Sequence, residues 1–204
     1  MVEYLLEHGA VIEAGEDVPI IYLAVSSGRA ADVEMLIAAG AELHKRRSDR
    51  GNVLHQILES SSPDKAEIVK MLLQNGVDIN CAALNGETPL ISALILREED
   101  IAVYLAGNGA DVTHADEAGN TALHYCMGLP QAAKSIIDAG ADVNARNSAG
   151  STPLHFAANC NDTEFVRQLL ACGAEKNVRD HWKKVPADYT SLQELKTVLT
   201  EKKQ

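Results

Sequence analysis

Apolar residues recur along the chain in short stripes that fit one face of an α-helix. In the stripe Ile68-Val69-x-x-Leu72-Leu73 they stand at positions i, i+1, i+4 and i+5, a spacing that places them on one side of a helix with about 3.6 residues per turn. A glycine, here Gly76, follows the stripe and suits the left-handed conformation that ends many helices. The same combination recurs before Gly9, Gly40, Gly109, Gly140 and Gly173. The pattern predicts a series of helices, each buried on one face.

A second motif precedes a shorter apolar run and recurs at a nearly constant step. Its clearest copy is Thr152-Pro153-Leu154-His155, in which the threonine suits a helix N-cap and the proline suits the first helical position. The first residues of the copies stand at positions 19, 52, 88, 121, 152 and 185, so the steps are 33, 36, 33, 31 and 33 residues. This period predicts units of two helices and a loop, which stack because neither helix can cover its apolar stripe alone.

Together, the 33-residue step and the two motifs resemble the ankyrin repeat family over essentially the whole chain. The resemblance implies an all-α solenoid of stacked helix-turn-helix units joined by β-turn finger loops, and we expect a single domain over residues 1–204. The expected units are a partial N-terminal repeat at 1–18, which supplies only a second helix, repeats at 19–51, 52–87, 88–120, 121–151 and 152–184, and a C-terminal capping repeat at 185–204.

The two unequal steps locate changes of length between the helices of a unit. Extra residues in the segment 60–64 explain the 36-residue step, and we expect Ser62 to cap the following helix with Pro63 in its first turn. A shortened first helix before Gly128-Leu129-Pro130 explains the 31-residue step. Both segments flank the expected binding face and are expected to shape a specific site there.

Composition and charge narrow the class of partner. The chain has 204 residues, of which 46% are hydrophobic, and its net charge of −11 repels phosphate backbones and anionic lipid surfaces. No apolar run approaches the roughly 18–20 residues that cross a bilayer, and the acidic N-terminus is unlike a signal peptide. We therefore expect neither nucleic acid nor a membrane as partner. The four cysteines form no Cys-x-x-Cys pair, which favours free thiols in a cytoplasmic compartment, with the nucleus as the alternative.

The side chains that suggest chemistry are better explained by structure. His55, His124 and His155 all occupy the fourth position of the second motif, and the family resemblance implies that such a histidine bridges backbone groups of adjacent loops. The acids at positions 98–100 are expected at the solvated start of a helix, where they favour its dipole. We find no motif for a catalytic residue, a metal or a cofactor, and expect no small-molecule substrate.

A protein partner is therefore the expected ligand, bound by the concave surface of first helices and finger tips. Several apolar side chains stand at positions that the fold does not need buried, and aromatic side chains among them are typical anchors for a protein partner. The alternative is a structural role for the two aromatic residues, in which Tyr125 packs on a neighbouring unit and Trp182 covers the last finger. A basic finger offers a second candidate for an acidic partner, unless it is an ordinary solvated loop. The candidates are Leu84, Ile95, Leu96, Tyr125 and Trp182, and in the basic finger Lys45, Arg46, Arg47 and Arg50.

These observations predict a non-catalytic protein-interaction module or scaffold, monomeric unless the uncovered N-terminal helix associates. The alternative is a targeting or substrate-recognition segment of a larger enzyme or effector, such as a kinase, a ubiquitin ligase or a bacterial effector. A further hypothesis concerns Asn80, Asn144 and Asn177, which end the D-V-N turn of the resembled family. That resemblance implies possible hydroxylation by an asparaginyl hydroxylase, although a structural amide that bonds the turn is the simpler role.

Overall fold

The computed structural model describes residues 19–46 and 51–201. The predicted partial repeat at 1–18, together with Arg47 and Arg50, lies outside the described residues. Every regular element of the described part is helical, and its extended pairing is an isolated bridge between Ala115 and Thr121. The predicted all-α repeat fold is thus confirmed. The chain forms an N-terminal unit, residues 1–101, and a C-terminal unit, residues 102–204, and α7 (Glu99–Gly107) contains the boundary.

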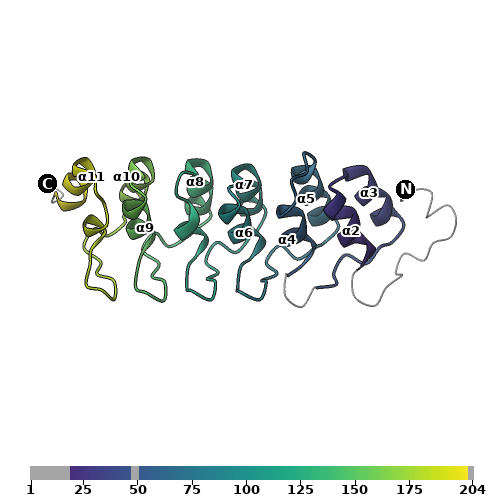
Figure 1. Cartoon of the computed structure of the whole chain (residues 1–204), viewed down its shortest axis with the longest axis horizontal. Coiled ribbons are helices and arrows are strands. Elements are labelled where there is room, and N and C mark those ends of the chain that lie inside the picture. Colours follow the sequence, from purple (N-terminus) through teal and green to yellow (C-terminus); the bar gives the residue numbers. More distant parts are fainter. Residues whose placement is uncertain (1–18, 47–50, 202–204) are drawn as a thin grey trace. The chain divides into compact units, whose positions relative to one another are not determined.

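The N-terminal unit is built of paired helices. Each repeat begins with an inner helix and continues into an outer one, and fingers extend from the inner-helix side (Figure 1). The inner helices α2, α4 and α6 pack in sequence, the outer helices α3 and α5 pack on each other, and each outer helix packs on its own inner helix. Ile21, Leu36, Leu54 and Leu72 are fully buried between them. The bounds are α2 (Ile20–Ser27), α3 (Ala30–Ala38), α4 (Val53–Leu58), α5 (Lys65–Gln74) and α6 (Pro89–Ile95).

The C-terminal unit repeats this arrangement with two inner helices reduced to 3₁₀ turns. Inner elements η1, α9 and η2 pack in sequence, and each contacts its outer helix. Leu123, Ile136, Leu154 and Leu169 are buried at these contacts, and α11 closes the core with Leu195. The bounds are η1 (Ala122–Tyr125), α8 (Pro130–Asp138), α9 (Pro153–Asn159), α10 (Thr163–Ala171), η2 (Pro186–Asp188) and α11 (Gln193–Thr200).

Helix ends follow the residues that the motifs supply. The Thr88 hydroxyl accepts a hydrogen bond from the Ile91 amide at 3.4 Å, with Pro89 at the first helical position. Thr152 is likewise the N-cap residue of α9 with Pro153 at the first helical position, but its hydroxyl lies 2.9 Å from His155 Nδ1. The glycines that follow the outer helices have φ between 80° and 99°, which confirms the predicted left-handed ends. They are Gly40, Gly76, Gly109, Gly140 and Gly173.

The unequal steps arise where the sequence places them, with one correction. The shortened inner helix is confirmed, because η1 is a 3₁₀ turn that ends before Pro130 begins α8. The prediction that Ser62 caps α5 is wrong, since the helix begins at Lys65 and Asp64 is its N-cap residue. The Ser62 hydroxyl instead accepts from the Asp64 amide at 3.0 Å, and this local turn competes with helix initiation.

One finger holds a non-glycine residue where its neighbours have glycine. Lys183 has φ of 62°, and it stands three residues before the first residue of its inner element, as Gly86, Gly119 and Gly150 do. A left-handed conformation costs an L-residue about 1 kcal/mol. We therefore expect Lys183→Gly to raise the free energy of unfolding by up to about 1 kcal/mol in chemical denaturation. Lys184→Gly, next to it in the chain, should not stabilise, and equal effects of the two changes would contradict this explanation.

Candidate interaction face

Buried histidines tie the inner helices to the fingers in both units. In each case Nδ1 accepts a hydrogen bond from the backbone N–H of the N-cap residue, at 3.2 Å for His55 and 3.1 Å for His124 and His155. Nε2 then lies within bonding distance of the carbonyl that ends the following finger, namely Glu87, Ser151 and Lys184 at 3.0, 3.2 and 3.3 Å. This geometry requires the neutral Nε2–H tautomer and confirms the predicted structural role.

Burial also sets the charge state of these rings. It lowers the pKa of His55, His124 and His155 below the ordinary value of 6.5, and hydrogen bonds to backbone groups oppose that shift only in part. A neutral ring cannot give up its Nδ1 lone pair to a proton without losing the bond from the N-cap amide. The three rings are therefore held neutral as structural linkers.

This charge state predicts that stability falls with pH below about 6.5. The unfolded chain takes up protons at the ordinary histidine pKa of 6.5, whereas the folded rings stay neutral to lower pH. The unfolded state then binds more protons, and each histidine removes up to about 1.4 kcal/mol per pH unit. Chemical denaturation between pH 7.5 and about pH 5 should show this loss until the folded rings titrate. Unchanged stability across that window would contradict the buried neutral tautomers.

Neighbouring fingers of the C-terminal unit are joined by backbone and side-chain bonds. The Ser148 amide donates to the Ala118 carbonyl at 2.9 Å, and the His181 amide donates to the Ala149 carbonyl at 3.0 Å. Within a finger, the Tyr125 hydroxyl donates to Asp116 at 2.5 Å and accepts from the Asn120 amide group at 3.0 Å. Tyr125 is half-buried, and its polar end is committed to its own finger.

The same device closes the last finger. The Tyr189 hydroxyl donates to Asp180, and this bond to a carboxylate raises the pKa of Tyr189 to about 12. Asp180 Oδ1 accepts the Trp182 and Lys184 amides at 2.9 and 3.0 Å. These hydrogen bonds to Asp180 fix the conformation of the loop that carries Trp182. The Trp182 residue itself is 64% exposed.

The basic finger of the N-terminal unit is partly used by the fold. Arg46 Nη2 donates to the carbonyl of Ala82 in the next finger at 2.5 Å, and the Lys45 carbonyl accepts from the Tyr22 hydroxyl at 2.7 Å. Tyr22 occupies the motif position of the bridging histidines. Arg47 and Arg50 lie outside the described residues, so the basic candidate is represented by Lys45 and Arg46.

Exposed apolar side chains gather on the inner-helix ends and fingers of the N-terminal unit. Leu84, at a finger tip, is 71% exposed, and Ile95 and Leu96, at the end of α6, are 41% and 42% exposed. Sequence reasoning missed Leu23 on α2, which is 64% exposed. Gln56 stands at the matching position one repeat later, and a polar residue at that position is the signal of an exposed site.

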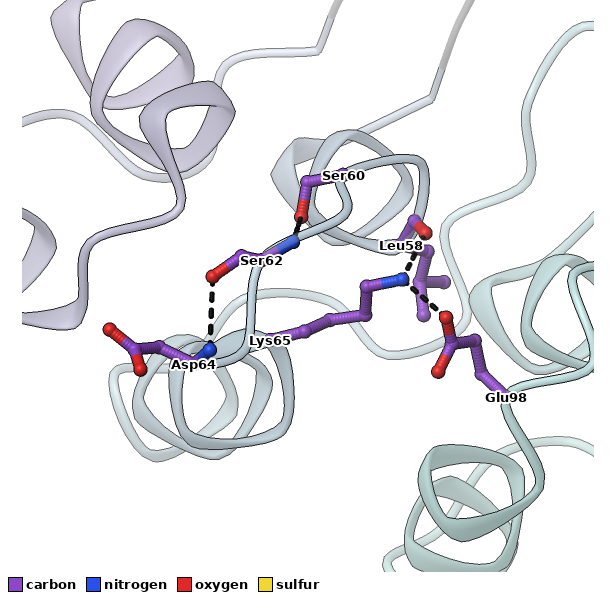
Figure 2. Close-up of polar contacts among 6 residues, drawn as sticks. All are labelled: Leu58, Ser60, Ser62, Asp64, Lys65 and Glu98. Atoms are coloured by element: carbon purple, nitrogen blue, oxygen red, sulfur yellow. Dashed lines mark hydrogen bonds and ion pairs between the residues drawn. The ribbon is translucent and has the colours of Figure 1, made fainter.

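An ion pair between Lys65 and Glu98 links two repeats of the N-terminal unit. Lys65 is the first residue of α5 and directly follows residues 59–64, which connect α4 to α5 and are called the 59–64 link below. Lys65 Nζ donates to the Leu58 carbonyl at 2.9 Å and to Glu98, while Ser62 and Asp64 bond within the link (Figure 2). Lys65 is buried. The expectation that Glu98 is a solvated helix start is wrong for this residue, because its carboxylate neutralises the Lys65 ammonium. Glu99 and Asp100 do lie in the first turn of α7.

The three asparagines differ in their surroundings. Asn144 accepts from the Glu175 amide at 2.8 Å and donates to the Gly173 carbonyl at 3.4 Å, so it links neighbouring turns. The backbone N–H of Asn80 donates to Asp78 Oδ1 at 2.9 Å, and Asn80 and Asn177 are exposed residues. Asn144 thus has the structural role, and the exposed pair remains the hypothesis for hydroxylation.

We searched residues 19–46 and 51–201 for a metal site and for a membrane-spanning helix. Within these ranges no cluster of three or more His, Cys, Asp or Glu side chains is arranged to hold a metal ion. In the same part of the chain, no helix combines the length and hydropathy that a membrane span requires.

A comparison with family models identifies the repeats. A model described as "Ankyrin repeats (3 copies)" matches residues 21–116, 54–147 and 113–180. The chain belongs to the ankyrin repeat family. Ankyrin repeats are protein-interaction modules and are generally non-catalytic, and the histidine bridges and glycine-ended helices described above are the features that hold these repeats together.

Relatives share part of this ankyrin array. Human "Ankyrin repeat and SOCS box protein 6" is 32% identical over 130 residues, 58% of this chain. "Phosphocholine transferase AnkX" of Legionella pneumophila is 26% identical over 126 residues, 57% of this chain, and "Intracellular phospholipase A2" of Caenorhabditis elegans is 28% identical over 184 residues, 85% of it. The chain spans only 30%, 13% and 17% of the lengths of these three relatives.

Proposed function

We propose that this chain is a non-catalytic module that binds a protein partner through its finger tips and inner-helix ends, in the cytoplasm or nucleus. The observation that carries the proposal is the exposure of Leu84 at a finger tip and of Ile95 and Leu96 at the end of α6, all in the N-terminal unit. Exposed apolar groups of this size on a rigid scaffold favour a protein ligand. Trp182 offers a separate aromatic anchor in the C-terminal unit.

The chemistry of the described residues supports binding rather than catalysis. The buried histidines have both ring nitrogens in structural bonds, and the ion pair of Lys65 and Glu98 is internal to the fold. The net charge of −11 disfavours nucleic acid as the ligand. We therefore assign no catalytic residue, cofactor or small-molecule substrate to this chain, and we expect a monomer.

A larger protein context is the second form of this proposal. Two relatives are named as enzymes, a phosphocholine transferase and a phospholipase A2, and the chain matches only 13% and 17% of their lengths. In such a context the repeats would select a target for activity that resides in another part of the protein. The binding face and its test are the same in both forms.

Affinity capture with paired variants tests the proposed face. Ile95→Glu/Leu96→Glu places two charges on the end of α6, and we expect at least about a tenfold loss of the captured partner, because a buried unpaired charge is costly. Trp182→Ala is measured separately. Ala66→Glu/Gln74→Glu adds the same charge at two exposed positions of α5 and should retain binding. Equal losses in both double variants, or no loss in either, would contradict the proposal.

A further inference from the structure

The last finger of the C-terminal unit differs from its neighbours at two consecutive positions. The fingers that precede η1, α9 and η2 lie in a row (Figure 1). The first two carry Ala118-Gly119 and Ala149-Gly150 where the last carries Trp182-Lys183. Trp182 is 64% exposed, and Lys183 holds the left-handed backbone, with φ of 62°, that glycine adopts in the other two fingers. A strained residue is a signal of function, so these two side chains are candidates for contact with a partner.

The same finger ends a ladder of backbone hydrogen bonds. The Ala118 carbonyl accepts from the Ser148 amide at 2.9 Å, and the Ala149 carbonyl accepts from the His181 amide at 3.0 Å. Trp182 holds the equivalent position in the last finger. Its carbonyl accepts no hydrogen bond from residues 19–46 or 51–201. An open backbone acceptor at the end of a ladder can be used by a backbone N–H of an extended segment that lies alongside it.

Four cations belong to this finger or bond to it. Arg179, Lys183 and Lys184 lie in the finger, and Arg146 of the preceding finger donates to the Arg179 carbonyl at 2.7 Å. Lys184 Nζ lies 5.1 Å from the centroid of the Tyr189 ring. Within the part of the chain that the structure describes, none of the four forms an ion pair. The finger is therefore a positive site in a chain of net charge −11, and it attracts carboxylates.

The acidic residues of this finger and of η2 are used by the fold. Asp180 is buried, and its two oxygens accept two backbone amides of the finger and the Tyr189 hydroxyl. Asp188 Oδ2 accepts from the Val185 amide at 2.9 Å. These two carboxylates lower the local charge, but the four cations still outnumber them. An acidic ligand can therefore pair with the finger without displacing an ion pair of the described residues.

We propose that the last finger binds an extended acidic segment of the partner protein. A backbone N–H of the segment donates to the Trp182 carbonyl, its carboxylates pair with Lys183 and the neighbouring cations, and an apolar side chain packs on the indole. A nucleic-acid backbone is also anionic, but it has no N–H to donate to this carbonyl. The inference rests on the proposed function, because it names the chemistry of one segment of the same partner.

Tryptophan fluorescence of the full chain tests the inference. Trp182 is the only tryptophan of the sequence, so its emission reports on this finger. Selection of short random peptides against the full chain supplies the probes, and we expect a class of acidic peptides that shift the emission to shorter wavelengths. Replacement of their Asp and Glu by Asn and Gln should weaken binding about tenfold or more. Methylation of one backbone nitrogen of the peptide should cause a similar loss.

Variants of Lys183 separate a lost contact from a lost fold. Lys183→Glu should weaken binding of these peptides about tenfold, because it places a carboxylate against the acidic segment. Lys134→Glu, at an exposed position of α8, makes the same charge change and should leave affinity unchanged. Lys183→Gly should weaken binding about threefold by removal of one exposed charge, although it relieves backbone strain and should not lower stability.

The outcomes separate the inference from the proposed function. Peptides that shift the emission without acidic residues, or equal losses in Lys183→Glu and Lys134→Glu, would overturn the inference. An emission shift caused by the concentration of the chain alone would also overturn it, since a second copy would then cover the finger. Selected peptides that leave the emission unchanged but are lost in Ile95→Glu/Leu96→Glu would overturn the acidic site and leave the proposed face standing. A selection that yields no specific binder would count against both.

Discussion

We expect His124→Ala to lower the free energy of unfolding by about 3 kcal/mol. The ring is fully buried and packs edge-on against Phe156 at 5.3 Å between centroids. Its removal leaves the Thr121 amide and the Ser151 carbonyl without their partner and opens a cavity. Chemical denaturation followed by circular dichroism measures the loss.

An exposed histidine of the same unit provides the control for this variant. His181→Ala should change stability by less than about 0.5 kcal/mol, because the side chain lies on a finger surface. A loss below about 1 kcal/mol in His124→Ala would show that the bridge between inner helix and finger contributes little. Similar losses in the two variants would contradict a specific role for the buried ring.

The second large effect is expected at Gly119, where two fingers of the C-terminal unit approach closely. The residue has φ of 76°, and a Cβ there would lie 2.7 Å from the Ser148 backbone nitrogen. That nitrogen bonds the Ala118 carbonyl at 2.9 Å, so relief of the clash breaks the link between fingers. We expect Gly119→Ala to cost about 3 kcal/mol, the sum of backbone strain and the lost bond.

Gly109 separates these two causes. Its φ is 93°, but no atom lies within 4 Å of the added Cβ position, so Gly109→Ala carries only the cost of a left-handed alanine, about 1 kcal/mol. Hydrogen exchange of the Ser148 amide should accelerate in Gly119→Ala and not in Gly109→Ala. Equal stability losses in the two variants would contradict close finger packing.

Much of the fold could be predicted because its signals are local. The starts of α6 and α9 are defined by a threonine and the proline after it, at Thr88 and at Thr152. The repeat period then identifies the buried leucines even when the residues that they pack against are not known. Ser62 was misjudged because a serine before a proline suits both a cap and a short turn. The choice between them depends on Asp64, whose carboxylate accepts the Ala30 amide at 3.2 Å from the neighbouring repeat.

The sequence predicts which candidate residues are exposed better than it predicts their hydrogen bonds. Leu84 and Trp182 are exposed at finger tips as their repeat positions indicate, whereas the commitment of Tyr125 to Asp116 depends on how the finger folds back. The pair of Lys65 and Glu98 is separated by 33 residues, one repeat length. Opposite charges at that spacing were a signal, but the 59–64 link decides whether the two side chains meet.

Photo-crosslinking in the protein's own cells tests the binding face most directly. A photoreactive residue is placed at position 84 or 95 in the N-terminal unit, and at exposed positions 66 or 74 of α5 for comparison. A module that binds through finger tips and inner-helix ends should give a discrete crosslinked protein from 84 and 95 and none from 66 or 74. Crosslinks from α5 alone, or from none of the four positions, would contradict this binding mode.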